Sequence, residues 1–377
     1  VLRDFGDRNR KEDPVMHFFE GFLQEYDSKI RKDRGVFYTP QPVVSFIVRS
    51  VDEQLRMEFG LEDGLADMTT WGELEKRVKD LEIPAGISPD QAFVQILDPA
   101  TGTGTFPVEV IDLIYKTMTT KWQSQGNREA QIKELWNDYV PKYLLPRLHG
   151  YELMMAPYAI AHMKIGLKLY ETGYRFKSDE RARIYLTNAL EPAQDFSGSF
   201  EFVIPALAKE VEAVNLIKRD KRFTVVIGNP PYSRHSSNPS RQASGKFTFI
   251  GKLVEDFKEG CPELFKPAQG KYLQDDYIKF MRLYLFILEK SQLGVLGVIT
   301  SHGYLDNPTF RGVRRNIVNF FQHLAFVDLH GNANKGEKTP EGGVDENVFA
   351  IRQGVSILVA SRLCAGVSNI VHHSDIW

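Results

Sequence analysis

The sequence predicts an α/β fold in which a mostly parallel β-sheet is covered by helices on both faces. Short apolar runs alternate with stretches whose apolar residues recur at helical spacing, an order typical of parallel sheets. The chain has 377 residues, which fits two or three domains or one large α/β domain with insertions. With 42% hydrophobic and 25% charged residues, the composition excludes a disordered or collagen-like chain.

Each element is predicted from its own pattern. Short apolar runs predict strands at 93–97, 144–151, 183–186, 223–227, 294–300 and 324–329. Helical spacing between these runs predicts helices at 106–121, 128–138, 155–171, 275–291 and 309–321. Two neighbouring runs at 347–351 and 355–360 predict a terminal hairpin, antiparallel to the other strands. Loops are expected at 191–222 and 331–346.

The first part of the chain is predicted to be helical. Residues 14–31 and 42–59 carry apolar residues at helical spacing, and Pro14 and Pro42 lie where a first turn accepts proline. A shorter helix is expected near 71–81. Because the chain begins at Val1 without a signal-peptide pattern, we expect a segment of a longer polypeptide.

Several classes of protein are excluded. No apolar run reaches the roughly 18 residues of a spanning helix, so we expect no membrane partner and a cytoplasmic location. Two cysteines cannot build a disulfide framework or a Cys-rich zinc site. No Gly-Lys pair precedes Ser or Thr, which excludes a P-loop. We predict no metal, and we interpret His372 and His373 as surface residues. The formal charge is −2, so any nucleic-acid footprint must be local.

The strongest motif is DPATGTGTF at residues 98–106, which follows an apolar run and opens a predicted helix. Ligands of open α/β sheets bind at the carboxyl ends of the strands. Gly102 and Gly104 let the backbone approach a ligand closely, and a helix N-terminus favours a negative group. No third glycine follows at the dinucleotide spacing. The alternative is a strand-to-helix turn without a ligand.

The second motif is Asn229-Pro230-Pro231-Tyr232, directly after the run at 223–227. Two prolines fix the backbone and remove two amide donors. The Asn229 side chain and a proline carbonyl can then accept hydrogen bonds from one amino group, while Tyr232 offers a flat face to a ring. The alternative is a simple proline turn.

DPATGTGTF followed by NPPY resembles the S-adenosylmethionine-dependent amino-methyltransferases. The upstream segment GVFYTP at 35–40 is similar to the gamma-group N6-adenine DNA methyltransferases. Together with HGYE at 149–152, it looks most like the methyltransferase region of type ISP restriction–modification enzymes. The resemblance covers about residues 15–361 and implies a Rossmann-like methyltransferase fold.

The resemblance also implies a domain division. Residues 1–34 would be a helical N-terminal segment, such as the end of a preceding coupling domain, and 35–365 the catalytic domain. Enzymes of this group usually carry a target-recognition domain after the last motif. We expect that domain to be absent from this chain, and we therefore expect cofactor binding without efficient site-selective methylation.

A cofactor pocket follows from the same resemblance. Thr39, flanked by Tyr38 and Pro40, would contact the methionine part of S-adenosylmethionine. Glu152 would accept hydrogen bonds from the ribose hydroxyls, a task that suits a carboxylate at a strand end. Asn188 stands where the family often has Asp and would contact the adenine ring, since an amide keeps acceptor and donors. The remaining pocket residues would be Asp98, Ala100, Thr101, Gly102, Gly104 and Phe106.

The substrate base would lie between two aromatic side chains. Phe349 resembles the residue that packs against an extruded base, opposite Tyr232; the alternative is a core Phe on a strand. Hydrogen bonds from the adenine N6 amino group to Asn229 and Pro230 would aim its lone pair at the methyl group for in-line transfer.

The basic footprint is local. Residues 218–252 hold eight Lys or Arg residues and one acid, around the NPPY motif. Arg234, Arg241 and Lys246 are the residues expected at the DNA backbone. The alternative is an ordinary solvated surface.

The leading hypothesis is an adenine-N6 DNA methyltransferase module that acts on an extruded adenine of double-stranded DNA. Its expected partners are fused or associated target-recognition, helicase or nuclease domains. Two alternatives stay open: a methyltransferase for a protein glutamine amide, and a silent cofactor- or DNA-binding module.

Overall fold

The computed structural model describes residues 39–79, 81–177, 180–193, 205–232, 236, 238–266, 270–349, 351–364 and 368–376. The predicted helix at 14–31 and the segment 1–34 lie outside these residues. Within the described ranges, no helix is long and apolar enough to cross a membrane.

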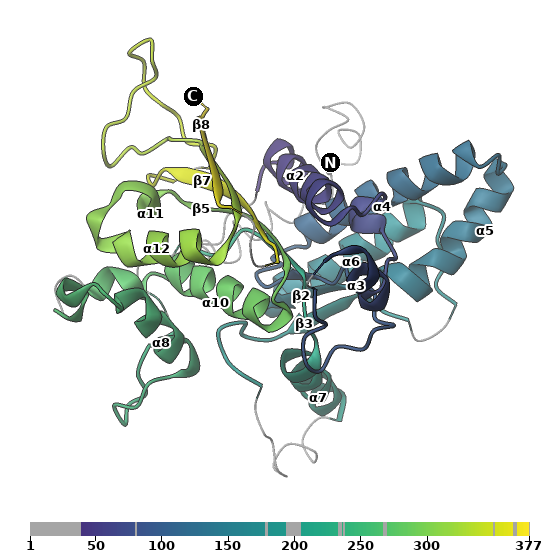
Figure 1. The fold of residues 1–377 in the computed structure, drawn as a ribbon, viewed down its shortest axis with the longest axis horizontal. Helices are drawn as coiled ribbons and strands as arrows, with labels where there is room; N and C mark the ends of the chain where they lie inside the picture. Colours follow the sequence, from purple (N-terminus) through teal and green to yellow (C-terminus); the bar gives the residue numbers. More distant parts are fainter. Residues whose placement is uncertain are drawn as a thin grey trace.

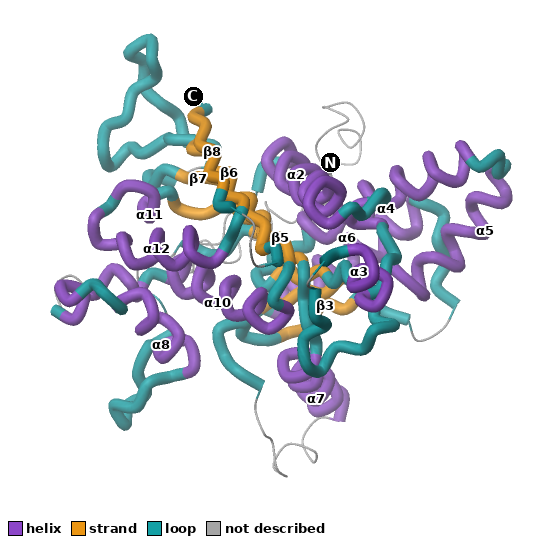
Figure 2. Tube along the Cα trace, viewed as in Figure 1, coloured by secondary structure: helices purple, strands orange, loops and turns teal. Residues whose placement is uncertain are grey.

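One eight-stranded sheet runs through the molecule, in the order β3-β2-β1-β4-β5-β7-β6-β8 (Figures 1 and 2). The first five strands of this order pair in parallel, and β7 is antiparallel to both β5 and β6. The strands are β1 (Ile96–Asp98), β2 (Leu148–Glu152), β3 (Arg183–Leu186), β4 (Val225–Gly228), β5 (Gly294–Ser301), β6 (His323–Asp328), β7 (Val355–Arg362) and β8 (Ile370–Asp375). The mostly parallel α/β fold is confirmed.

Helices cover both faces of this sheet. A side chain at Gly297 of β5 would meet Ile47 and Val51 of α2, whereas one at Gly294 would meet Leu288 of α10. Residues three apart on a strand face opposite sides, so α2 and α10 lie on opposite faces. The longer helices are α2 (Gln41–Phe59), α3 (Trp71–Arg77), α4 (Thr105–Ser124), α5 (Glu129–Tyr139), α6 (Met155–Glu171), α7 (Pro205–Asp220), α10 (Asp276–Ser291) and α12 (Arg311–Phe320).

Short turns of helix complete the connections. They are α8 (Phe249–Val254), α11 (Gly303–Asp306), a π-turn at Val140–Leu144, and 3₁₀ turns at Gly64–Ala66, Glu255–Lys258, Pro262–Phe265, Lys271–Gln274 and Pro308–Phe310. The apolar face of α2 anchors the core through Val44, Ile47, Val48, Val51 and Leu55, all fully buried. Each such side chain contributes about 1.5–3 kcal/mol on burial.

The predicted terminal hairpin has the wrong partners. Antiparallel pairing at this end of the sheet is confirmed, but β7 inserts between β5 and β6, and residues 347–349 and 351 form no strand. Asn347 explains the difference, because its side chain bonds the carbonyls of Gly331 and Gln353 and accepts from the Phe349 N–H. A side chain that satisfies nearby backbone groups replaces a strand ladder.

The predicted loop at 191–222 is also wrong in part, because Pro205–Asp220 is the helix α7. Charged residues interrupt its apolar spacing in the sequence, which weakens the periodic signal. The loop predicted at 331–346 is confirmed, and Figure 1 shows it extending away from the sheet.

Candidate active site

The glycine loop lies between β1 and α4, and hydrogen bonds within the loop hold its shape. Asp98 Oδ1 accepts from the Ala100 N–H at 3.1 Å, and the Thr101 hydroxyl donates to the Asp98 carbonyl at 2.9 Å. Gly104 precedes α4 with φ 84°, and a Cβ there would lie 3.1 Å from Ala161 of α6. Backbone conformation and packing therefore both require glycine at 104.

Asp98 is a buried carboxylate beside the second motif. Its side chain is fully buried, and its Oδ2 has no hydrogen-bond partner among the described residues. Burial raises the pKa of Asp98 to about 8; the Ala100 N–H opposes this shift and the nearby Glu152 adds to it. A Cβ at Gly228 would lie 2.7 Å from Asp98 Oδ1, so Asp98 lies against the residue that precedes Asn229.

Glu152 ends β2 and faces the glycine loop. Its Oε2 accepts from the Gly102 N–H at 2.9 Å, and its Oε1 accepts from the Met154 N–H at 2.7 Å. Parallel pairing places Gly150 beside Asp98, which brings the two strand ends together. The structure thus joins two acidic residues and a glycine loop at the carboxyl edge of the sheet, where ligands of such folds bind.

Asn229 follows β4 and is held on both sides of its amide. Its Nδ2 donates to Thr39 Oγ1 at 2.9 Å, and its Oδ1 accepts from the Tyr232 hydroxyl. The two hydroxyl groups hold the amide from both sides. A neutral amide oxygen can accept a second hydrogen bond from an amino group. Pro230 is buried and Pro231 partly buried, so the loop is confined as its sequence predicts.

Tyr232 and Phe349 come together from distant parts of the chain. Their ring centroids lie 5.9 Å apart with an interplanar angle of 71°. The Tyr232 side chain is buried, which raises the pKa of its hydroxyl well above the usual value. The two aromatic residues predicted to face the base therefore touch each other edge to face.

Asn188 has partners that the sequence did not indicate. Its Nδ2 donates to Asn238 Oδ1 at 2.8 Å and to Glu191 Oε1 at 3.1 Å, and its Oδ1 accepts from the Leu190 N–H. Asn238 belongs to the loop that follows NPPY. Asn188 thus connects the end of β3 to that loop.

Two buried charged residues hold the same loop and were missed. Lys279 of α10 donates to Ser236 Oγ at 2.8 Å and to the Asn238 carbonyl at 2.6 Å, and Ser236 donates to Asp276. Sequence periodicity places both residues on a helix but gives no sign that they are buried. The sequence also gives no sign of Tyr284 on the same helix. Its hydroxyl is buried and has no hydrogen-bond partner among the described residues.

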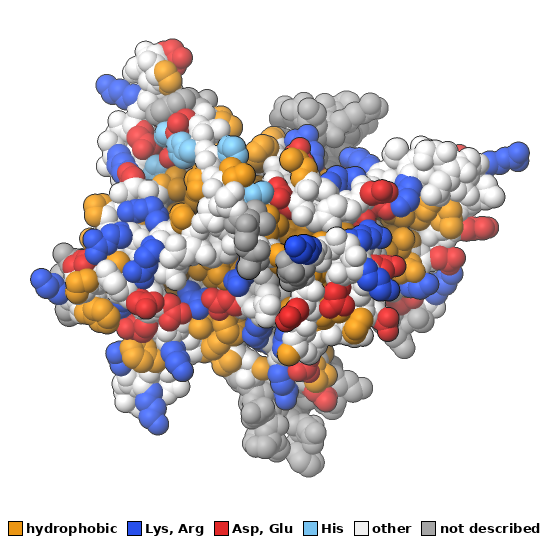
Figure 3. Space-filling model, viewed as in Figure 1, with side chains coloured by type: hydrophobic (Ala, Val, Ile, Leu, Met, Phe, Trp, Pro, Cys, Tyr) orange, Lys and Arg blue, Asp and Glu red, His pale blue; other side chains and the backbone are white. Residues whose placement is uncertain are grey.

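Fewer basic side chains of residues 218–252 are available to DNA than the composition of this segment indicates. Lys218 donates to the carbonyls of Asn188 and Glu191, and burial lowers the pKa values of Lys218 and Lys221 to about 8. Lys218 therefore holds the segment after β3, and both lysines are partly buried. Arg241 and Lys246 are exposed, on a loop in which the Arg241 guanidinium lies 3.7 Å from the Phe247 ring centroid. Scattered Lys and Arg side chains cover the face in Figure 3.

The remaining predicted residues lie near the glycine loop, ahead of α2, or outside the described part of the chain. Thr39 is buried, and Pro40 is partly buried ahead of α2. Thr101 and Phe106 are buried in the glycine loop and the first turn of α4. Tyr38 and Arg234 lie outside the described residues.

Two family models match parts of the chain. Residues 148–334 match the family model of the Eco57I restriction-modification methylase, and residues 10–59 match that of the N-6 DNA methylases. No curated protein matches the chain. The first family model spans β2 to the end of β6 and includes the NPPY motif.

Solved structures share the fold. The DNA-bound, ATP-dependent type ISP restriction–modification enzyme LlaBIII has a TM-score of 0.70 and 24% identity over 98% of this chain. A DrdV–DNA complex has a TM-score of 0.64 and 25% identity over 96%. The type ISP enzyme LlaGI has a TM-score of 0.66 and 21% identity over 98%.

This chain spans only 22%, 30% and 26% of those three proteins, respectively. The first matched span contains the NPPY motif, whereas the glycine loop at 98–106 lies outside both spans. The chain is thus similar to N6-adenine DNA methylase families and shares the fold of the type ISP restriction–modification enzymes.

Proposed function

We propose that this chain performs the methyl-transfer step of a restriction–modification enzyme, from S-adenosylmethionine to the N6 amino group of an adenine extruded from duplex DNA. The observation that carries the proposal is the fixed side chain of Asn229. Thr39 and Tyr232 hydrogen-bond to its amide, and the Tyr232 ring contacts Phe349. Asp98 lies against Gly228, the residue before Asn229.

The described residues fit the cofactor. The partnerless Oδ2 of Asp98 suits a hydrogen-bond donor such as the cofactor's ammonium group. A Cβ at Gly102 would meet no atom within 4 Å, so the loop leaves open space there. Glu152 ends β2 against the glycine loop, where a carboxylate suits ribose hydroxyls. When bound, S-adenosylmethionine supplies an electrophilic methyl group on its sulfonium sulfur.

The chain's own groups act by positioning. The Asn229 Oδ1 and the Pro230 carbonyl accept hydrogen bonds from the exocyclic amino group, which turns its lone pair away from the ring system. Tyr232 keeps the amide oxygen directed, and its ring, in edge-to-face contact with Phe349, is the proposed surface for the base. In-line transfer then needs no covalent bond to the protein, and catalysis is mostly orientation and electrostatics.

Double-stranded DNA is the proposed substrate. LlaBIII and DrdV are described as DNA complexes, and Arg241 and Lys246 stand on an exposed loop after NPPY. We assign the catalytic domain to residues 35–365, with 1–34 as a preceding helical segment. Target-recognition, helicase or nuclease domains are the proposed partners, whether fused or associated.

The test is a methyl-transfer assay with labelled S-adenosylmethionine and two acceptors. One is a duplex in which adenines stand opposite abasic sites, which lowers the cost of extrusion. The other is a peptide with an exposed glutamine. We expect N6-methyladenine from the duplex and no label in the peptide. Label only in the peptide would mean that the chain methylates amides and not adenine. Label in neither acceptor would mean that the chain binds the cofactor without transferring the methyl group.

A further inference from the structure

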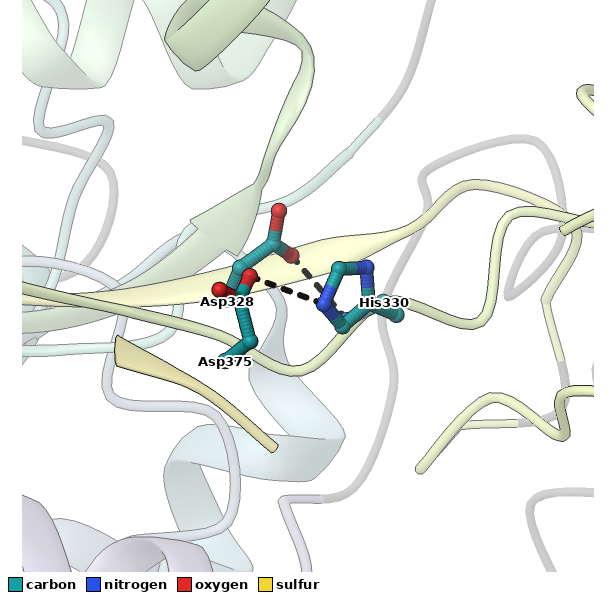
Figure 4. A group of neighbouring side chains, drawn as sticks. All are labelled: Asp328, His330 and Asp375. Carbon is teal, nitrogen blue, oxygen red and sulfur yellow. Dashed lines mark hydrogen bonds and ion pairs between the residues drawn. The ribbon is translucent and has the colours of Figure 1, made fainter. Parts of the chain in front are cut away.

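A cluster of metal-ligand side chains lies where β6 and β8 end, outside the residues assigned to methyl transfer. β6 and β8 pair in parallel with Asp328 opposite Asp375, and His330 follows β6. One ligand atom from each of these three residues lies within 4.8 Å of the others. Figure 4 shows the two carboxylates next to each other, with the His330 imidazole turned toward them.

The two carboxyl groups are held at the ends of paired strands, with Asp328 opposite Asp375. Asp328 Oδ1 accepts hydrogen bonds from the His302 ring at 3.0 Å and from the His330 backbone N–H at 3.0 Å. Its second oxygen, Oδ2, is then the atom that can face a ligand.

His302 orients Asp328. Asn332 Oδ1 accepts from the backbone N–H groups of Asn334 and Lys335, so Asn332 Nδ2 faces the His302 ring. Nδ2 lies 2.9 Å from His302 Nε2, which accepts this hydrogen bond. The Nδ1–H of His302 then donates to Asp328 and fixes the direction of its carboxyl group.

Two basic side chains near the cluster, Arg314 and Lys335, have partners outside it. Arg314 donates to the carbonyls of Tyr304 and Asn307, and Lys335 pairs with Asp306. A cavity of about 490 Å³, lined in part by Asp328, His330 and His373, opens beside the carboxylates. Figure 3 shows His side chains gathered on this face, near acidic ones.

We propose that Asp328, His330 and Asp375 bind a divalent transition-metal ion such as Zn²⁺ or Mn²⁺. Imidazole with carboxylates suits these ions, whereas Ca²⁺ and Mg²⁺ prefer oxygen alone. Ligands about 2.1 Å from a tetrahedral ion are about 3.4 Å apart. His330 Nε2 already lies 3.0 Å from Asp375 Oδ1, and the half-exposed Asp375 can close the remaining gap to Asp328. The cavity leaves room for His373 or water as a fourth ligand.

The ion would brace the loop that carries Phe349. His330 precedes Gly331, whose carbonyl accepts from Asn347 Nδ2 at 3.1 Å, and Asn347 Oδ1 accepts from the Phe349 N–H at 2.8 Å. An ion at His330 would therefore fix both the edge strand β8 and the start of this loop. The proposal goes beyond methyl transfer and does not depend on it.

The sequence predicted no metal because 45 residues separate His330 from Asp375 and only the strand register joins them. The test uses tag-free protein, stripped with chelator and titrated with Co²⁺ and Zn²⁺. We expect one Co²⁺ per chain with ligand-field absorption, displacement by Zn²⁺, and a higher thermal unfolding temperature with Zn²⁺.

His330→Gln and Asp375→Asn should each weaken binding at least about tenfold and abolish the thermal shift. His372→Gln is the matched control, because His372 neighbours the site in sequence but projects from the opposite face of β8. Circular dichroism confirms that the variants fold. The proposal would be overturned if the wild type showed no saturable metal binding. It would also be overturned if both ligand variants bound metal as tightly as the wild type, or if His372→Gln lost as much affinity as they do.

Discussion

The amide nitrogen of Asn229 donates to Thr39 Oγ1 across 2.9 Å, although 190 residues separate the two in the chain. This bond joins the segment before α2 to the loop after β4. Since the Tyr232 hydroxyl donates to the same amide's oxygen, Asn229 is held from both sides. Thr39 is thus a positioning residue for Asn229 as well as a proposed cofactor contact.

Replacing the Thr39 hydroxyl should slow methyl transfer. In Thr39→Val the Asn229 amide loses its acceptor, at a cost of about 1 kcal/mol, so we expect a roughly fivefold to tenfold slower single-turnover rate at saturating cofactor. Thr39→Ser keeps the hydroxyl and should stay near the wild-type rate. Equal rates for Val and Ser would show that the bond does not position Asn229.

The hydroxyl and the ring of Tyr232 should have separable effects. Tyr232→Phe loses the bond to Asn229 but keeps the ring beside Phe349, so base extrusion should persist while transfer slows. Tyr232→Ala should lose about 1–3 kcal/mol of stacking and with it the extruded state. Fluorescence of 2-aminopurine at the target position measures extrusion. Full extrusion by Tyr232→Ala would contradict the stacking role.

Asp98 should reduce stability in a pH-dependent way. Burial raises its folded-state pKa to about 8, above the unfolded value near 3.9. The cost of ionising buried Asp98 in the folded state is therefore absent below about pH 4, and it grows as the pH rises toward 8. Asp98→Asn cannot ionise, so without cofactor it should unfold at a higher temperature than the wild type at pH 8.5, with a smaller difference at pH 5. A difference independent of pH would contradict this.

DNA binding should depend on the exposed loop and not on the buried lysines. Arg241→Ala and Lys246→Ala should each lower the slope of log binding constant against log salt by about 0.9. Lys116→Ala is the control, because its side chain is exposed on α4 and far from NPPY in sequence. Equal slopes for all three variants would remove the loop from the interface.

The local spacing of apolar residues predicted individual helices and strands. The strand at 183–186 and the helix at 155–171 match β3 and α6, because uninterrupted periodicity marks both. The predicted hairpin was wrong because strand pairing depends on contacts between distant residues. The strand β7 pairs with β5 and β6. Motif order brought Asp98, Glu152 and Asn229 to one sheet edge, whereas Lys279 and Asp276 needed knowledge of burial that helical spacing does not contain.

The most direct measurement is calorimetric titration of the chain with S-adenosylhomocysteine, which tests whether the ends of β1 and β2 form the cofactor pocket. We expect micromolar binding, about 8 kcal/mol, that weakens at least about tenfold in both Asp98→Ala and Glu152→Ala and persists in Asn229→Ala. No binding by the folded wild type, or binding unchanged in both carboxylate variants, would contradict it.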